Sequence, residues 1–252
     1  NGELYGNNSE GFLTTDCGSY CTIADIKVTH TRNFTFRNNI IDYSRDNTAY
    51  SAAANANKGG IIGFWCDEGC IETKIAGNFF TNSPLAIMYE VSGSSIIASN
   101  IIESSGMGIR VAGSDDVKVY NNTISRTYRP VYIFEDSRID GCNYWKNGSC
   151  AAEEKWSKGL NLDWNTSGVE LYNNIISSRP LAASNDLTGG EYQRAYSLRV
   201  EGAQNVQGGP YVDANDMIKG FDYNAYYRND SADANLSVWD FKSGDGKNDT
   251  VL

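Results

Sequence analysis

Three carboxylates recur at nearly regular intervals along this chain: Asp67, Glu90 and Glu135. The step from Asp67 to Glu90 equals the step from Ala112, at the matching place of the next interval, to Glu135. If each interval is one turn of a coil of strands, these residues form one outward column with about 5 Å per turn. Asp67 and Glu90 then have the carboxylate spacing of retaining glycosidases, and Glu90 and Glu135, two turns apart, approach that of inverting ones.

Arg110 adds a cation to the same expected face. It lies two positions before Ala112, and strand side chains two residues apart point the same way. In a lyase, Arg110 or a Ca²⁺ ion held by the carboxylates would neutralise a uronate before proton abstraction. Without a metal, the stacked carboxylates would raise one another's pKa, as an acid and a nucleophile require.

Aromatic side chains could form platforms for sugar rings beside these charges. The candidates are Trp65, Tyr89, Trp145 and Trp156. Three interpretations of the face stay open at this point: a solvated surface without function, a sugar-binding groove, and a catalytic pair. The single histidine, His30, is expected to be structural, and one histidine does not allow a Ser-His-Asp set to be assembled.

The elements that position these side chains follow from a repeated phrase. Asn78, Asn100 and Asn122 are separated by steps of 22 residues, and the same phrase recurs at Asn39 and Asn174. A period of this length is typical of a solenoid, and the β-branched, alternating runs between the asparagines predict strands rather than helices. In a parallel coil the equivalent asparagines stack, so we expect Asn100 and Asn122 to be buried in a ladder of amide hydrogen bonds.

Three segments resemble the rungs of a known protein family: Gly63-Phe64-Trp65-Cys66-Asp67, Ala86-Ile87-Met88-Tyr89-Glu90-Val91-Ser92 and Gly108-Ile109-Arg110-Val111-Ala112-Gly113-Ser114. The family is a secreted group of right-handed parallel β-helix repeat proteins in the pectate-lyase-like superfamily. The resemblance covers roughly residues 22–190 and implies an all-β, right-handed parallel β-helix. That superfamily includes lyases, hydrolases, epimerases, tailspikes and adhesins, so the fold implies no single activity.

We expect one domain over residues 1–252, with rungs of about 22 residues. Two insertions interrupt the repeat, near residues 43–59 and 138–160, and an aromatic tail follows from residue 187. Solenoid ends need caps, and neither end has a clear one. We therefore expect a part of a longer chain, or a filament protomer whose copies stack end to end.

Charge excludes two classes of partner. Asp and Glu number 31 against 21 Lys and Arg, which gives a formal net charge of −10. Such an acidic chain is not expected to bind nucleic acid or anionic membranes. The sequence also has no apolar run long enough to insert into a membrane.

The six cysteines form close pairs in the sequence: Cys17 with Cys21, Cys66 with Cys70, and Cys142 with Cys150. An even number in close pairs favours disulfides and an oxidising, secreted environment, although six cysteines allow 15 pairings. The rival interpretation is a metal site, because Cys-x3-Cys occurs twice. We predict local pairing, with bridges that brace the insertions rather than the coil.

Eight Asn-x-Ser/Thr sequons point to a secreted glycoprotein. The best acceptors by sequence are Asn147, Asn229, Asn235 and Asn248, which lie in polar, loop-like segments. Asn121 is the least favoured because it lies within the ladder phrase. The alternative is that asparagine-rich turns produce sequons by chance.

The sequence therefore predicts a secreted β-helix protein that binds or cleaves polysaccharide through an outward acidic and aromatic groove. An enzyme of this kind would be a polysaccharide lyase or a glycoside hydrolase. The alternative is a non-enzymatic structural or adhesive extracellular glycoprotein, with copies of itself as partners.

Overall fold

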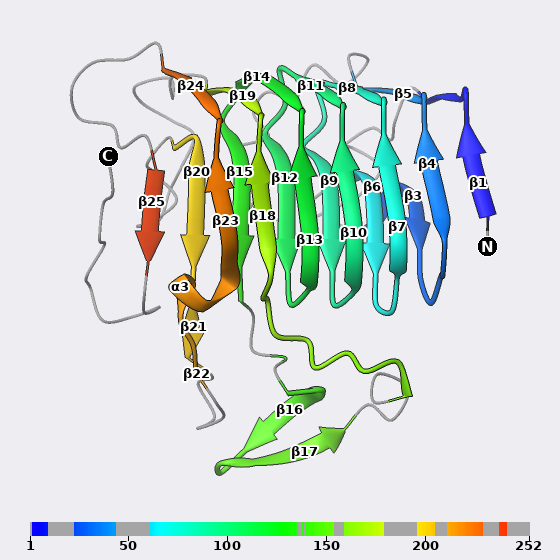
Figure 1. Cartoon of the computed structure of the whole chain (residues 1–252). Helices are drawn as coiled ribbons and strands as arrows, with labels where there is room; N and C mark the ends of the chain where they lie inside the picture. The colour runs from blue at the N-terminus through cyan, green and yellow to red at the C-terminus, as the bar shows by residue number, and fades with distance from the viewer. Residues whose placement is uncertain are drawn as a thin grey trace.

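The computed structural model describes residues 2–9, 23–43, 61–135, 138, 140–153, 159–178, 196–204, 211–228 and 237–240. Within them the chain winds through three seven-stranded parallel sheets, so that each rung gives one strand to each sheet (Figure 1). This is the expected all-β, right-handed parallel β-helix. No helix in the described part of the chain is long and apolar enough to cross a membrane.

Sheet A forms the front of Figure 1. Its strands, in order, are β1 (Gly2–Tyr5), β4 (Phe34–Arg37), β7 (Ile71–Ala76), β10 (Gly93–Ala98), β13 (Asp115–Tyr120), β18 (Val169–Tyr172) and β23 (Ile218–Asp222).

Sheet B lies along the top of that view. Its strands are β2 (Asn8–Ser9), β5 (Ile40–Asp42), β8 (Phe79–Thr81), β11 (Ile101–Glu103), β14 (Thr123–Thr127), β19 (Ile175–Ser178) and β24 (Ala225–Arg228).

Sheet C lies behind sheet A. Its strands are β3 (Ile23–Val28), β6 (Ile61–Asp67), β9 (Leu85–Glu90), β12 (Met107–Ala112), β15 (Arg129–Phe134), β20 (Leu198–Glu201) and β25 (Ser237–Asp240).

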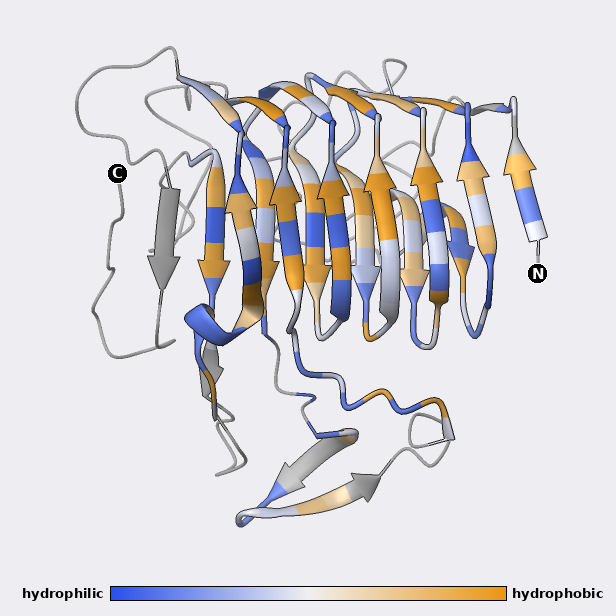
Figure 2. Cartoon of the chain, viewed as in Figure 1, coloured by the Kyte–Doolittle hydropathy of each residue, from blue (hydrophilic) through white to orange (hydrophobic). Residues whose placement is uncertain are grey.

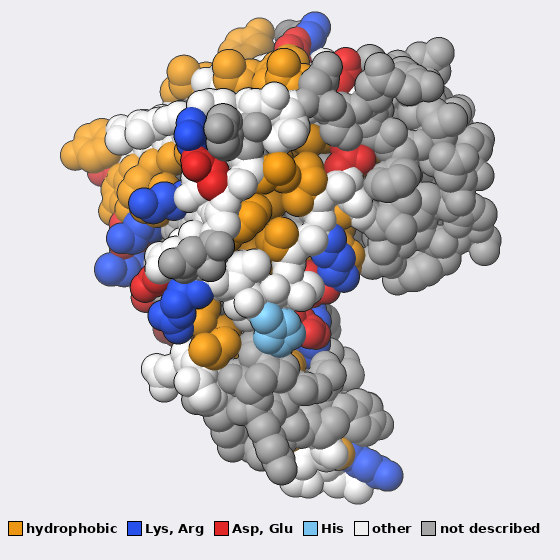
Figure 3. Space-filling model, turned by 90° about the vertical axis from the view of Figure 1, so that its right-hand side faces the viewer, with side chains coloured by type: hydrophobic (Ala, Val, Ile, Leu, Met, Phe, Trp, Pro, Cys, Tyr) orange, Lys and Arg blue, Asp and Glu red, His pale blue; other side chains and the backbone are white. Residues whose placement is uncertain are grey.

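The core is a stack of apolar rows, because alternate strand residues point inward. Figure 2 shows the alternation of hydrophobic and hydrophilic residues along the strands of sheet A. The inward rows are Ile75, Ile97, Val119 and Leu171 from sheet A, Ile41, Phe80, Ile102, Ile124 and Ile176 from sheet B, and Phe64, Ile87, Ile109, Val131 and Leu198 from sheet C, all fully buried. At the N-terminal end, hydrophobic side chains remain visible (Figure 3), and Leu4, Ile26 and Phe34 there are only partly buried.

The asparagine ladder occupies the corner between sheets A and B. Asn100 is 1% exposed, its Oδ1 accepts from the backbone N–H and the Nδ2 of Asn78, and its own N–H and Nδ2 donate to Asn122 Oδ1, all at 2.9–3.0 Å. The ladder continues to Asn7 at one end and Asn224 at the other. The predicted burial and amide bonding of Asn100 and Asn122 are confirmed.

Hydroxyl side chains form similar links at the other two corners. Between sheets C and A, Ser92 Oγ accepts from the Cys70 N–H, and Ser114 Oγ accepts from the Ser92 N–H. Between sheets B and C, Ser105 Oγ accepts from the Ser83 N–H. Side chains thus satisfy backbone groups that the bends remove from the sheets.

Two of the expected disulfides are present, Cys66–Cys70 and Cys142–Cys150. Cys66 and Cys70 are fully buried in the core and span the bend from β6 to β7, with 6.1 Å between their Cα atoms. The expectation that the bridges brace only insertions is wrong for this pair, which braces the coil itself. Cys17 and Cys21 lie outside the described residues.

The second insertion contains a hairpin that projects from the coil (Figure 1). Its strands are β16 (Cys142–Lys146) and β17 (Ser149–Glu153), joined by Asn147 and Gly148 with φ of 50° and 76°. Two residues with positive φ are typical of the tight turns that suit hairpins. The remaining elements are the short strands β21 (Ala203–Gln204) and β22 (Tyr211–Val212) and the helix α3 (Ala214–Met217).

Candidate functional site

The outer face of sheet C carries most of the residues expected to do chemistry. Asp67 pairs in register with Glu90, and Glu90 with Ala112, as the spacing predicts. On the next strand Ala112 pairs with Phe134, not with Glu135. The rung that begins at Ala112 is therefore one residue shorter than the step from Ala112 to Glu135 that the sequence suggested. Glu135 therefore leaves the column, which continues from Phe134 to Glu201.

Glu135 has a structural role instead. It is 2% exposed, and its Oε2 accepts from the Thr166 N–H at 2.5 Å. Thr166 in turn donates its hydroxyl to the carbonyl of Phe134 at 2.9 Å. These bonds fasten the end of the second insertion to the end of β15. The buried carboxylate of Glu135 therefore does not join Asp67 and Glu90 in the expected catalytic column.

The two remaining carboxylates each have a cation of their own. Asp67 Oδ2 lies 2.6 Å from Lys27 Nζ, and Glu90 forms an ion pair with Arg138. Glu90 also accepts from the indole N–H of Trp65 at 3.1 Å. Both carboxylates are thus already engaged by side chains of the protein itself.

The face around them is buried rather than open. Trp65, Met88 and Tyr132 are 5–7% exposed, Glu90 is 8% exposed, and Ala112 is fully buried. An outward acidic and aromatic groove was expected on this face. The structure corrects that expectation, because a polymer needs an open surface and these side chains present almost none.

Arg110 lies in the row formed by Trp65, Met88, Tyr132 and Arg199. Its guanidinium carbon is 4.4 Å from the centre of the Phe134 ring, a cation–π arrangement. Burial, and then the charge of Glu201, raise the pKa of Tyr132 well above its usual value. This row thus joins charges and rings in a mostly buried network.

Of the four aromatic candidates, one lies in the core, one faces outward, and the side chains of two lie outside the described residues. Tyr89 is fully buried and points inward, donating to the carbonyls of Cys70 and Gly93 at 2.9 Å, so its assignment to substrate binding is wrong. Trp65 faces outward but is 6% exposed. The side chain of Trp145 and the whole of Trp156 lie outside the described residues, as do Asn229, Asn235 and Asn248.

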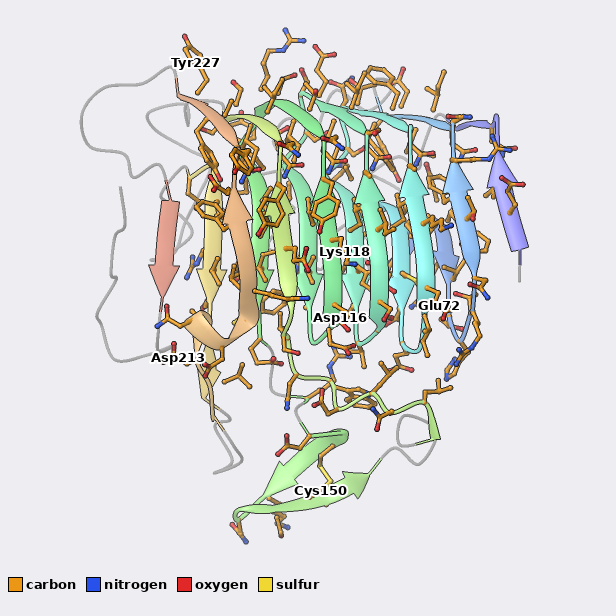
Figure 4. The ribbon with its side chains drawn as sticks, in the orientation of Figure 1. Glu72, Asp116, Lys118, Cys150, Asp213 and Tyr227 are labelled. Carbon is orange, nitrogen blue, oxygen red and sulfur yellow. A yellow bond between two sulfur atoms is a disulfide. The ribbon has the colours of Figure 1, made fainter. Side chains whose placement is uncertain are left out.

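An open hollow of about 460 Å³ lies on the outer face of sheet A. Its central row is Lys74, Ile96 and Lys118, one residue per rung, and Glu72 and Asp116 lie near the bottom of the same face (Figure 4). The other lining residues are Asn33, Thr73, Ser94, Ser95 and Lys219. Within the described part of the chain, Lys74 and Lys118 form no direct ion pair, although the charge of Lys118 helps to lower the pKa of Glu170 on the neighbouring strand.

A row of tyrosines lies on the same outward face of sheet A, beginning two residues after Lys118. Tyr120 and Tyr172 are register partners with ring centres 5.8 Å apart, and Tyr223, 74% exposed, follows at 6.5 Å. Desolvation, and the hydrogen bond that Tyr120 donates to Glu170, raise the pKa of Tyr120 to about 12. That bond and one from Lys219, 3.1 Å from Glu170, lower the pKa of Glu170.

The acidic residues at the start of β13 add a pH-sensitive group. Burial raises the pKa of Asp115 to about 6, and the charges of Asp116 and Asp163 act in the same direction. In the described part of the chain, no group of three or more His, Cys, Asp or Glu side chains is arranged to hold a metal ion.

Asp115→Asn should stabilise the fold at pH 8 but not at pH 4. A carboxyl whose pKa is raised on folding favours the folded state when protonated, so the fold loses this stability as the pH rises from about 4 to 6. Because the group is partly exposed, we expect a gain of about 1 kcal/mol at pH 8. Urea unfolding of both proteins at the two pH values measures it, and an equal gain at both would contradict the assignment.

The hollow on sheet A was missed although the sequence contains its signal. Lys74, Ile96, Lys118 and Glu170 each lie four residues before a ladder asparagine, and Tyr120 and Tyr172 each lie two before one. The same alignment that placed Asp67 and Glu90 therefore defines these rows. The alignment does not show which outward face of the coil stays open to solvent.

Three sheets of parallel strands, one rung apart and joined at laddered corners, define a right-handed parallel β-helix protein. A family model for the right handed beta helix region matches residues 59–180, which confirms the resemblance found in the sequence. Searches of curated proteins and of solved structures found no match.

Proposed function

We propose that the protein is secreted and binds a polysaccharide chain across the rungs of sheet A. The observation that carries this proposal is the open hollow of about 460 Å³, with a row of tyrosines on the same face of sheet A. Sugar-binding surfaces combine aromatic rings with a few polar groups that fix orientation, and both occur here.

The polar groups of the hollow suit sugar hydroxyls. Lys74 and Lys118 donate, Glu72 and Asp116 accept, and Asn33 and Ser94 do both. Lys74 and Lys118 are two rungs apart, about 10 Å, with Ile96 between them. A linear polymer lying along the coil axis would meet these groups in succession, whereas a compact ligand would meet few of them.

The support for a catalytic pair on sheet C is weaker. Asp67 and Glu90 are each paired with a cation, and Glu90 is nearly buried. The proposal is therefore a binding protein, with cleavage as an outcome to be measured.

A second candidate is a structural extracellular protein, and one observation favours it. One outward row on sheet B contains Ile40, Ile101 and Ile175, which are 44%, 48% and 57% exposed, with Phe79 and Thr123 between them. An exposed apolar row of this kind favours contact with another surface. Sedimentation of the purified protein would reveal self-association.

Binding to immobilised polysaccharides, both neutral glucans and mannans and the uronate polymers polygalacturonate and alginate, tests the first candidate. We expect the double variant Tyr172→Ala with Lys118→Ala to lose at least tenfold in affinity, about 1.4 kcal/mol. Lys146→Ala, on the distant hairpin, is the matched control and should bind like the parent.

Two results would overturn this assignment. If the double variant binds normally while Arg110→Gln or Glu90→Gln does not, the polysaccharide site is on sheet C. If the parent protein binds none of the polymers, the binding function itself is wrong. Release of new reducing or unsaturated ends during the assay would show cleavage.

A further inference from the structure

The structure divides the sequons into two kinds. Five of the eight lie in the described part of the chain, at Asn7, Asn33, Asn121, Asn147 and Asn165. A glycan is bulky and needs the modified side chain to reach solvent from the folded protein. Because glycosylation replaces one of the two hydrogens of the amide nitrogen, a side chain that already uses this nitrogen in the fold is a less favourable acceptor.

Two of the five asparagines use that nitrogen within the fold. Asn7 Nδ2 donates to Asn39 Oδ1 at 3.0 Å, as the first step of the ladder. Asn165 Nδ2 donates to Asp140 Oδ1 at 3.0 Å, and its Oδ1 accepts from the Asp140 N–H at 3.1 Å. A glycan on either residue would replace one of the two amide hydrogens and crowd these contacts.

The other three asparagines are exposed at bends. Asn33, Asn121 and Asn147 have φ of 53°, 55° and 50°, the left-handed conformation of turn residues. Their side-chain amides form no hydrogen bond with any described residue. Each is followed two residues later by a hydroxyl, from Thr35, Thr123 and Ser149 respectively.

The environment of Asn121 differs from the one expected from the sequence. The sequence disfavoured it because it lies within the ladder phrase. The residue that enters the ladder is Asn122, 1% exposed, whereas Asn121 precedes it on the outside of the bend. The two neighbours thus have opposite environments.

We propose that Asn33 and Asn121 are N-glycosylation sites, together with Asn147, when the chain passes through a eukaryotic secretory pathway. The co-reactant is a lipid-linked oligosaccharide diphosphate. The Asn amide nitrogen attacks the anomeric carbon, so a C–N bond forms while the C–O bond to the diphosphate breaks. The lipid diphosphate leaves with the bonding electrons, and the amide gives up one proton.

A glycan at Asn33 has a consequence for ligand binding, since Asn33 lines the hollow on sheet A. This consequence rests on the proposed polysaccharide binding, whereas the modification itself requires only passage through a eukaryotic secretory pathway. A sugar chain held there would compete with a polysaccharide for the same surface. The unmodified form should then bind the polymer more tightly than the modified one.

Mass spectrometry of the secreted, folded fraction of the full chain tests the modification. We expect site occupancy at Asn33, Asn121 and Asn147 to exceed that at Asn7 and Asn165 several-fold. Thr35→Ala and Thr123→Ala keep each asparagine but destroy its sequon, and both threonines are only partly buried, so the fold should persist. Each variant should lose one glycan from the intact mass.

Equal or greater occupancy at Asn7 and Asn165, or an unchanged mass for either variant, would overturn the proposal. Polygalacturonate and glucan binding by Thr35→Ala separates the two claims. Loss of the glycan with tighter binding supports both claims. Loss of the glycan with unchanged binding keeps the modification and contradicts the role of the hollow.

Discussion

Replacing Asn100 with leucine is expected to destabilise the protein by about 3–5 kcal/mol. The Asn78 N–H and Nδ2 would lose their acceptor, and the Ile75 carbonyl would lose a donor, in an environment where Asn100 is 1% exposed. Each buried polar group left unsatisfied costs about 1–3 kcal/mol. Leucine is no smaller than asparagine, so the loss reports hydrogen bonding rather than a cavity.

Urea unfolding followed by circular dichroism measures this cost. The matched control is Asn215→Leu, the same substitution at an exposed position of α3, which should change stability by less than about 0.5 kcal/mol. A similar midpoint for both variants would mean that the ladder contributes little to stability.

Gly108→Ala is expected to cost about 3 kcal/mol, because β12 and β15 come too close there for a side chain. A Cβ at this position would lie 2.4 Å from the carbonyl oxygen of Pro130 and 3.2 Å from a methyl group of Ile124. The oxygen belongs to the backbone of the neighbouring strand, so relief requires the sheet itself to move.

Gly159→Ala provides the comparison, since nothing lies within 4 Å of the added carbon. It should be neutral or stabilise the fold by about 0.5 kcal/mol through reduced freedom of the unfolded chain. Thermal unfolding of both variants tests the pair, and equal melting temperatures would contradict the close approach seen in sheet C.

The parts of the fold that repeat could be predicted from the sequence. The regular steps between Asn78, Asn100 and Asn122 place one corner of every rung, and β-branched alternation places the strands around it. The serine links at the other corners escaped notice, although Ser92 and Ser114 are separated by the same step. Serine is a common turn residue, so its regular spacing is a weaker signal.

Features set by single rungs or by insertions could not be predicted in this way. Glu135 left the acidic column because one rung is shorter than the carboxylate spacing implied, and a shift of a single position moves a side chain to the other face. Tyr89 was expected on the surface for its chemistry, although its position beside Glu90 in the strand already made it an inward residue. The exposure of a side chain depends on how the whole chain folds around it, so it cannot be predicted from the periodicity of the sequence alone.

The sequence placed the candidate site on sheet C, whereas the open face in the structure belongs to sheet A. Strand alternation places charged and polar residues in the outward rows of both sheets A and C. Burial then distinguishes them, because Glu90 and Tyr132 on sheet C are 7–8% exposed while a hollow stays open beside Lys118 on sheet A.

A crystal structure of the protein with a bound oligosaccharide tests the central claim most directly. We predict sugar rings against Tyr120 and Tyr172, with hydroxyl or carboxylate groups within hydrogen-bond distance of Lys118 and Lys74. Sugar bound instead beside Arg110 and Glu90 on sheet C would contradict the proposed site and restore the face that the sequence first indicated.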